Sequence, residues 1–293
     1  MAWRTLDGSA PRIIAHRGAS GLRPEHTLEG YSLALAQGAD IVEPDLVVSA
    51  DGVLFARHDP GLARSTDIRL RPQFAARQEQ GDWPCDRFDA DEIDQLRAIQ
   101  PNPARSAEFD RRWPPPRWPA VLAWAQQAAH ERGEPVLLYP EIKHPALFQA
   151  RGVDAVQAFA ASVAEARPGV QVWVQCFDAW ALRRVHEATG LPCSLGVTKG
   201  ADWRAALDEH SDWLAGLIAS KELLRSFGGA DSGLVAAAHA GGLRVDAYTF
   251  RDDQVGKGHA GIGEELAAAM ELGVDGLFCD FPATALSVRA RLR

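Results

Sequence analysis

The sequence predicts an α/β fold, a (β/α)8 TIM-type barrel with a small insertion after the second strand. Eight short apolar runs alternate with segments of helical apolar spacing in a chain of 293 residues. This alternation is typical of parallel sheets whose strands are joined by helices, and eight units at this length indicate a barrel. The alternative is a doubly wound open sheet. Such sheets usually carry a glycine-rich phosphate loop after the first strand, and no Gly-x-Gly-x-x-Gly pattern stands there.

The first unit of the barrel is expected before residue 59. Residues 12–15 form a short apolar run, read as the first strand, and residues 28–36 have helical spacing. The second strand is expected over 40–48. A turn signal at Asp51-Gly52 then leads into a short strand over 53–56, so the second strand should extend into a hairpin.

Residues 59–118 differ from the rest of the chain in composition. They are rich in Arg, Asp, Gln and Pro, and their apolar residues show no regular period. A short helix is expected over 91–99, whereas the prolines at 114–116 cannot lie inside a helix. We interpret this segment as an insertion within one catalytic barrel domain that spans residues 1–293.

A regular rhythm of helices and strands begins at residue 119. Helix–strand pairs are expected at 120–131 and 136–142, 153–166 and 170–176, 180–188 and 192–197, 203–210 and 214–219, 232–240 and 243–249, and 264–272 and 275–279, with a closing helix over 284–292. With the first two strands, these pairs give the eight strands of the predicted barrel.

Composition and charge exclude several classes of protein. The formal net charge of −8 argues against a general nucleic-acid binder, which needs Lys and Arg to neutralise phosphates. No apolar run approaches the roughly 20 residues that span a bilayer, and no signal-peptide core follows Met1, so we expect no stable membrane insertion and a cytoplasmic location. The cysteines show no metal-type spacing and are expected to be mostly buried thiols: Cys85, Cys176, Cys193 and Cys279.

Three carboxylates fall where predicted strands end. Glu43 and Asp45 are two residues apart on one strand, so they share a face with Cα atoms about 6.6 Å apart at a rise of about 3.3 Å per residue. Glu141 ends the next strand. Three carboxylates at one point repel each other unless a cation neutralises them, and all-oxygen ligation suits Mg²⁺ or Ca²⁺. The alternative is that they pair with Arg17 and Lys143.

Two histidines leave strands at the same end of the predicted barrel. His16 and His58 can serve as base and acid near neutral pH. Arg17 can bind two phosphate oxygens, and Lys143 can add a point charge. The remaining histidines are interpreted as structural: His26, His130, His144, His186, His210, His239 and His259. The set indicates cleavage of a phosphodiester with a divalent cation.

These residues stand in motifs that resemble the signature of the glycerophosphodiester phosphodiesterase family. The similar segments are Ala15-His16-Arg17-Gly18-Ala19, Pro24-Glu25-His26-Thr27, Glu43-x-Asp45, His58-Asp59-Pro60, Tyr139-Pro140-Glu141-Ile142-Lys143, Gln175-Cys176-Phe177-Asp178, Tyr248-Thr249-Phe250-Arg251 and residues 275–282. The resemblance covers nearly the whole chain. Most members carry Asn where this chain has His26; the His version resembles the family's periplasmic branch.

The resemblance implies a barrel with a small insertion, and hydrolysis of glycerophosphodiesters to glycerol 3-phosphate and an alcohol. It further implies roles for individual residues: Glu43, Asp45 and Glu141 as metal ligands, His16 and His58 as acid and base, Arg17 and Lys143 on the phosphate, and Phe177 in the glycerol pocket. Tyr248, at the end of the seventh strand, is a further candidate for substrate binding.

Two other functions remain open at this point. The first is a lysophospholipase-D-like phosphodiesterase that acts on lipids, for which Trp83, Trp113 and Trp118 could line an acyl channel. The second is a non-catalytic binding protein that uses the same end of the barrel. The intact set of ionisable residues argues against this second alternative.

Overall fold

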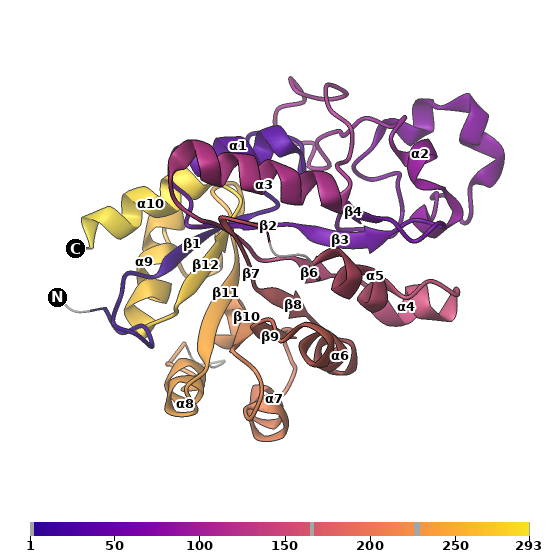
Figure 1. Ribbon diagram of the computed structural model, residues 1–293. Helices are drawn as coiled ribbons and strands as arrows, with labels where there is room; N and C mark the ends of the chain where they lie inside the picture. The colour runs from indigo at the N-terminus through magenta and orange to yellow at the C-terminus, as the bar shows by residue number, and fades with distance from the viewer. Residues whose placement is uncertain (1–2, 165–166, 226–228, 293) are drawn as a thin grey trace.

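The computed structural model describes residues 3–164, 167–225 and 229–292 as a barrel of strands surrounded by helices (Figure 1). The fold is the predicted (β/α)8 barrel. Its strands are β1 (Arg12–His16), β2 (Ile41–Glu43), β3 (Asp45–Val48), β4 (Leu54–Ala56), β5 (Val136–Leu138), β6 (Glu141–Ile142), β7 (Val170–Val172), β8 (Val174–Cys176), β9 (Cys193–Val197), β10 (Gly216–Ser220), β11 (Arg244–Phe250) and β12 (Gly276–Cys279).

Three of the eight barrel strands are interrupted, which gives eleven short strands, and the hairpin strand β4, antiparallel to β3, is the twelfth. The order is β4-β3-β6-β8-β9-β10-β11-β12-β1-β2-β5-β7, and β3 continues β2 across Pro44, so the order runs round into a barrel. The prediction of unbroken strands over 40–48, 136–142 and 170–176 was wrong in this detail. Pro44 has no N–H to donate, but its carbonyl still accepts from Glu141 N at 2.9 Å. Pairing therefore continues past the break.

The helices pack around the barrel, close to the ranges expected from the sequence. They are α1 (Leu28–Gln37), α2 (Ala90–Ile93), α3 (Trp118–Arg132), α4 (Pro145–Ala150), α5 (Ala155–Ser162), α6 (Ala179–Thr189), α7 (Trp203–His210), α8 (Leu234–Ala240), α9 (Ile262–Leu272) and α10 (Pro282–Arg291). The short α4 was not expected. None of the helices in the described ranges combines the length and the apolar character that crossing a bilayer requires.

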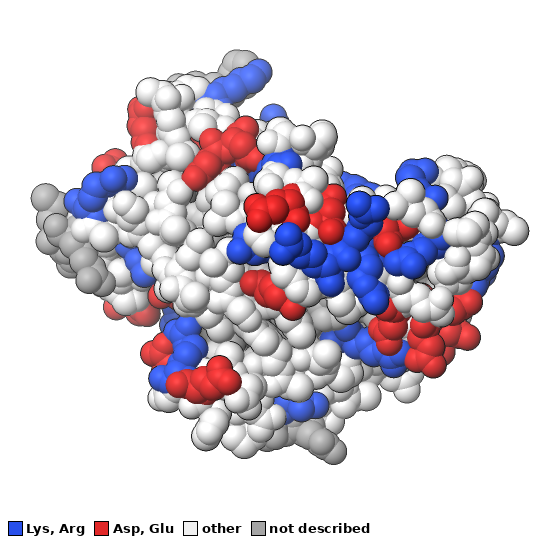
Figure 2. All heavy atoms as spheres, turned by 90° about the horizontal axis from the view of Figure 1, so that it is seen from above, with Lys and Arg blue, Asp and Glu red and all other residues white. Residues whose placement is uncertain are grey.

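The segment between β4 and α3 projects from the upper right of the barrel around α2 (Figure 1). The helix expected over 91–99 is shorter, because the Asp89 capping box starts it at Ala90 and it ends at Ile93. The other regular elements are 3-10 helices at Asp67–Leu70, Pro72–Arg77 and Cys85–Arg87. Seen from above, Lys and Arg side chains gather over this part of the molecule, with acidic side chains between them (Figure 2).

The interior of the barrel is apolar in its middle and closed at its amino-terminal end. Ile14, Ile41, Tyr139 and Phe278 fill the centre and are at most 2% exposed. At the amino-terminal end, two guanidinium groups lie over the ring of Trp173, those of Arg12 at 4.9 Å and Arg244 at 4.4 Å. Access to the barrel interior is therefore left to the carboxyl ends of the strands, where the predicted site residues stand.

Candidate active site

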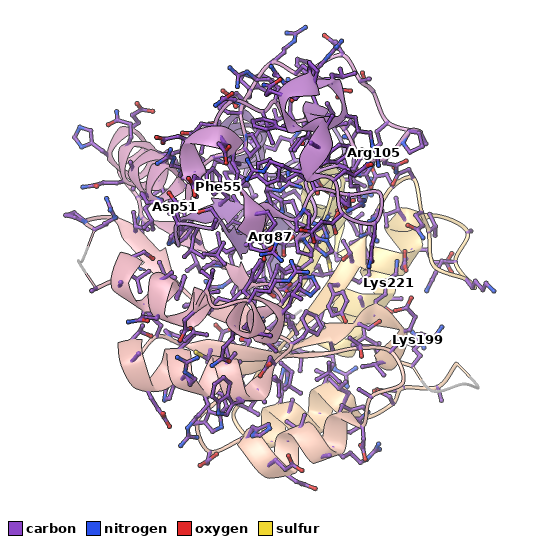
Figure 3. The ribbon with its side chains drawn as sticks, turned by 90° about the vertical axis from the view of Figure 1, so that its right-hand side faces the viewer. Asp51, Phe55, Arg87, Arg105, Lys199 and Lys221 are labelled. Atoms are coloured by element: carbon purple, nitrogen blue, oxygen red, sulfur yellow. The ribbon has the colours of Figure 1, made fainter. Side chains whose placement is uncertain are left out.

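A cavity of about 1780 Å³ opens at the carboxyl ends of the barrel strands. Its lining includes every site residue expected from the sequence: His16, Arg17, Glu43, Asp45, His58, Glu141, Lys143, Phe177 and Tyr248. In Figure 3, Arg105 lies on the side of the insertion, and Lys199 and Lys221 lie below it on the loops that follow β9 and β10. The structure thus brings the expected site residues from five of the eight barrel strands, and His58 from the end of the hairpin strand β4, to one place.

The three carboxylates of Glu43, Asp45 and Glu141 face one another. Each offers an oxygen, and these oxygens all lie within 4.8 Å of one another. All three residues are buried, and Asp45 Oδ1 has no hydrogen-bond partner among the described residues. Buried oxygens so close together fit a hard divalent cation, which prefers oxygen ligands. The three carboxylates therefore fit a site for Mg²⁺ or Ca²⁺.

Burial and neighbouring charges shift the pKa values of the three carboxyl groups. Burial, together with the neighbouring Asp45, raises the pKa of Glu43 well above its ordinary value. Burial likewise raises the pKa of Glu141 to about 7, against the attraction of Lys143. The pKa of Asp45 is instead held well below its usual range, because Lys143 and Arg17 outweigh the effect of its burial. The protein's own cations therefore do not neutralise the cluster fully.

Two cations border the carboxylate cluster. Arg17 lies in a tight turn after β1, with Nη1 2.8 Å from Glu25 Oε2 and Nε 3.1 Å from Asp45 Oδ2. Lys143 Nζ lies 2.8 Å from Glu141 Oε1 and 3.6 Å from Asp45 Oδ1. The ion pairs that the sequence offered as an alternative to a metal site are thus present. They are compatible with phosphate binding, because both side chains also line the cavity.

His16 is oriented by an aspartate from the other end of the chain. Its Nδ1 lies 2.6 Å from Oδ1 of Asp280, the residue after β12. Burial, together with the nearby Arg17, lowers the pKa of His16 to about 4. The pKa of Asp280 is lowered too, because the attraction of His16 outweighs the effect of burial on the carboxylate. Nε2 has no protein partner among the described residues, so this nitrogen is free to exchange a proton.

His58 repeats the same arrangement with its neighbour in sequence. Its Nδ1 lies 2.6 Å from Oδ1 of Asp59, and Asp59 Oδ2 accepts from Arg64 Nη1 at 3.0 Å. The pKa of Asp59 is lowered, since these hydrogen bonds outweigh its burial. Two imidazoles, each held at Nδ1 by a carboxylate, therefore line one cavity beside the carboxylate cluster.

Arg105 of the insertion holds the carboxylate that orients His16. Its Nη2 donates to Asp280 Oδ2 at 2.6 Å, and its Nε and Nη2 donate to the two carboxylate oxygens of Asp253 at 2.7 and 3.0 Å. Nη1 also donates to the carbonyl of Ser20 at 3.2 Å. The Arg105 side chain is 8% exposed. This guanidinium ties the insertion to the β1, β11 and β12 ends of the barrel.

If His16 moves a proton during a reaction in this cavity, Arg105→Ala is expected to lower kcat by about tenfold, because a misaligned imidazole loses a large part of its effect as acid or base. The pH at which activity falls on the acid side should rise, since Asp280 would then act on His16 with Arg251 as its one remaining guanidinium partner among the described residues. The measurement is a kcat–pH profile. Arg112→Ala, in the same insertion but exposed, is the matched control. An unchanged profile for Arg105→Ala would leave it only a structural role.

Phe177 and Tyr248 form an aromatic wall of the cavity. Their rings meet edge to face with centroids 5.7 Å apart, and the Tyr248 hydroxyl donates to the carbonyl of Val197 at 3.2 Å. Phe177 fits because residue 196 is glycine: a Cβ there would lie 2.4 Å from the Phe177 ring. Phe177 is 38% exposed, although it is a large apolar side chain. The wall suits the carbon backbone of a small ligand.

The proposed acyl channel of three tryptophans is not found. Trp83 is buried and donates its indole N–H to Phe74 O at 2.7 Å, and Trp118 is buried and donates to Ser162 Oγ at 2.9 Å. Trp113 stacks on Phe109. The three side chains are placed within the structure of the insertion and of α3, and none of them lines the cavity.

Sequence reasoning missed the partners that hold the expected residues in place. His26, interpreted as structural, lies with Nε2 3.0 Å from Asp45 Oδ2 and Nδ1 3.0 Å from the Tyr31 hydroxyl. Gln175 donates to Glu43 Oε1 at 3.2 Å. Asp59 could have been noticed as the direct neighbour of His58. His16 ends the first strand and Asp280 follows the last, 264 positions away, so only closure of the barrel brings them together.

Comparison with known proteins decides the family. The model of the glycerophosphoryl diester phosphodiesterase family matches residues 16–284. The chain belongs to this family. It is accordingly an enzyme, a phosphoric diester hydrolase, and the resemblance of its motifs to the family signature is confirmed.

The phosphodiesterase is similar over nearly its whole length to curated and solved relatives. It is 26% identical to a glycerophosphodiester phosphodiesterase of Arabidopsis thaliana over 95% of this chain and 86% of the relative, and 26% identical to one of Haemophilus influenzae over 93% and 88%. A solved phosphodiesterase from Oleispira antarctica, in complex with the product sn-glycerol-3-phosphate, matches 97% of this chain and 98% of its own with a TM-score of 0.70 at 21% identity. This structural match supports the barrel of the phosphodiesterase.

Proposed function

We propose that the enzyme hydrolyses glycerophosphodiesters to glycerol 3-phosphate and an alcohol, with one divalent cation and two histidines. The observation that carries this proposal is the meeting of three buried carboxylates and two carboxylate-held imidazoles in one cavity. The product in the Oleispira antarctica structure supports the same substrate class. A cytoplasmic location and the absence of a nucleic-acid partner stay predictions.

Glu43, Asp45 and Glu141 would hold the cation. A bound Mg²⁺ or Ca²⁺ would neutralise phosphate oxygens and stabilise the charge that develops there. Arg17 adds a fixed guanidinium, and Lys143 adds a point charge on the other side of the cluster. These side chains bind and orient the phosphate, while Phe177 provides an apolar wall for the glycerol.

The two imidazoles move the protons. One of His16 and His58 accepts a proton at Nε2 from the attacking hydroxyl, and the other donates a proton to the departing alcohol oxygen. Asp280 and Asp59 fix the rings by accepting from Nδ1, which sets the tautomer that leaves Nε2 available. Each carboxylate also stabilises the imidazolium that forms while the proton is held.

Removal of divalent cations should abolish the release of glycerol 3-phosphate from glycerophosphoglycerol, and Mg²⁺ or Ca²⁺ should restore it. The cation should also raise the melting temperature of the stripped protein, because it binds the folded state. Glu43→Gln should remove both effects and stabilise the metal-free protein, since one of three mutually repelling carboxylates is gone. Calorimetric titration and thermal unfolding measure these changes independently of turnover.

Glu131→Gln, on the exposed side of α3, is the matched control and should respond to cations like the unmodified protein. Full activity after removal of metal, with no change of melting temperature on adding it back, would contradict the metal site. Failure to release glycerol 3-phosphate from any glycerophosphodiester in the presence of metal would contradict the function itself.

A further inference from the structure

A second, smaller cavity adjoins the main one on the side of the insertion. Its volume is about 330 Å³, and it shares His16, Arg17, Arg251 and Gln254 with the main cavity. Its outer wall comes from the insertion, through Arg64, residues 100–103 and Arg105. The two cavities therefore meet at the arginine and the histidine that border the proposed phosphate position.

The arrangement gives the two halves of a phosphodiester different surroundings. The aromatic wall of Phe177 and Tyr248 belongs to the main cavity, together with the three carboxylates and Lys143. None of these residues reaches the second cavity, whose lining is polar apart from two prolines and the aliphatic parts of its polar side chains. A phosphate at Arg17 with its glycerol against the aromatic wall would direct the departing alcohol toward the second cavity.

The lining of the second cavity offers more positive than negative charge. Four guanidinium groups and two carboxylates border it. Both carboxylates are already engaged: Glu25 Oε2 lies 2.8 Å from Arg17, and Asp280 pairs with His16, Arg105 and Arg251. Asp59 and Asp253 pair with Arg64 and Arg105 but are not among the lining residues. The charged groups that face the cavity are therefore mainly guanidinium groups, which would repel a positively charged alcohol such as choline.

The same lining offers hydrogen-bonding groups that are still unused. Arg251 donates through Nε to Asp280, and Arg64 donates through Nη1 to Asp59; their other N–H groups have no side-chain or backbone acceptor among the described residues. Gln254, which lines both cavities, is exposed, and its side-chain amide has no partner among the described residues, so its oxygen can accept. Donors and an acceptor in one small polar cavity suit a ligand with several hydroxyl groups.

We propose that the second cavity binds the leaving alcohol and selects hydroxyl-rich alcohols without a positive charge. The inference rests on the proposed phosphodiesterase function and adds its substrate class. Inositol and glycerol are alcohols of this kind, whereas choline carries a quaternary ammonium group that donates no hydrogen bond. Selectivity should then depend on the charge at Arg64, which lies on the wall that the insertion contributes.

The test compares kcat/KM for glycerophosphoinositol and glycerophosphocholine. The unmodified enzyme should favour glycerophosphoinositol by about tenfold, and Arg64→Glu should reduce this ratio by at least about fivefold, because a reversed charge attracts the choline cation. Arg64 also contacts Asp59, the partner of His58, so turnover will fall for both substrates. The ratio of the two kcat/KM values is unaffected by a loss of turnover that both substrates share. Arg64→Gln should lie between the two.

Arg69→Glu makes the same change of charge at an exposed position of the insertion that borders neither cavity. It should leave the ratio unchanged. If both substrates are hydrolysed and Arg64→Glu has the same ratio as Arg69→Glu, the leaving-group site is wrong while the phosphodiesterase function stands. If neither substrate releases glycerol 3-phosphate, the function itself is wrong.

Discussion

Replacing His16 or His58 with alanine is expected to lower kcat by about 10²–10⁴, the usual contribution of a general acid or base. The expectation rests on the shared geometry of the two rings, each held at Nδ1 by a carboxylate at 2.6 Å. The double variant should be little slower than either single one, because both residues serve one sequence of proton transfers. Single-turnover rates of purified variants, with metal saturating, give the comparison.

The matched control is His259→Ala. His259 lines the same cavity, but no carboxylate of the described residues holds its ring, so kcat should stay within about threefold. Thermal unfolding should show that the His16 and His58 variants are folded, because both rings lie at the mouth of the barrel. A His58→Ala enzyme with near-normal turnover would assign the proton transfer to another group.

The barrel could be predicted because its signals are local. Each apolar run and each helical segment is read within about a dozen residues, and residues two apart on a strand share a face. Glu43 and Asp45 were therefore placed together correctly. The breaks in the strands were not predicted, although Pro44 marks one of them. Strand hydrogen bonding is present before and after Pro44, and only the sheet shows where it is interrupted.

The supporting contacts of the site are long-range, and for that reason the sequence could not predict them. Arg105 reaches Asp280 across 175 positions, from an insertion whose own folding has no periodic signal. The pairing of His16 with Asp280 depends on β1 and β12 being neighbours, a consequence of barrel closure. The candidate catalytic and binding residues could be predicted from the sequence, but the residues that orient them are identified only from the contacts of the closed barrel.

A glycerophosphodiester carries a hydroxyl on the carbon next to the one that bears the phosphate, and a substrate without it should bind but react at least about 10²-fold more slowly. This hydroxyl is a nucleophile already tethered to the phosphate, so its attack avoids the entropy of capturing a water molecule. Among the described residues that line the cavity, Cys176 is the candidate for a covalent nucleophile. It is buried, and burial raises the pKa of its thiol to about 12, so its thiolate is scarce at neutral pH. The substrate's own hydroxyl is the better nucleophile.

We propose that the two histidines then divide the reaction into two steps. The 2-hydroxyl loses its proton to one imidazole and attacks phosphorus, the bond to the leaving alcohol breaks, and the other imidazole protonates that alcohol. Water next attacks the cyclic 1,2-phosphate with the roles reversed, and the bond from phosphorus to the 2-oxygen breaks to give glycerol 3-phosphate. Arg17 holds the phosphate in both halves. The cyclic phosphate, supplied as a substrate, should be hydrolysed at least as fast as the parent diester, followed by ³¹P NMR. Hydrolysis of the 2-deoxy analogue at the normal rate would show instead that water attacks the diester directly.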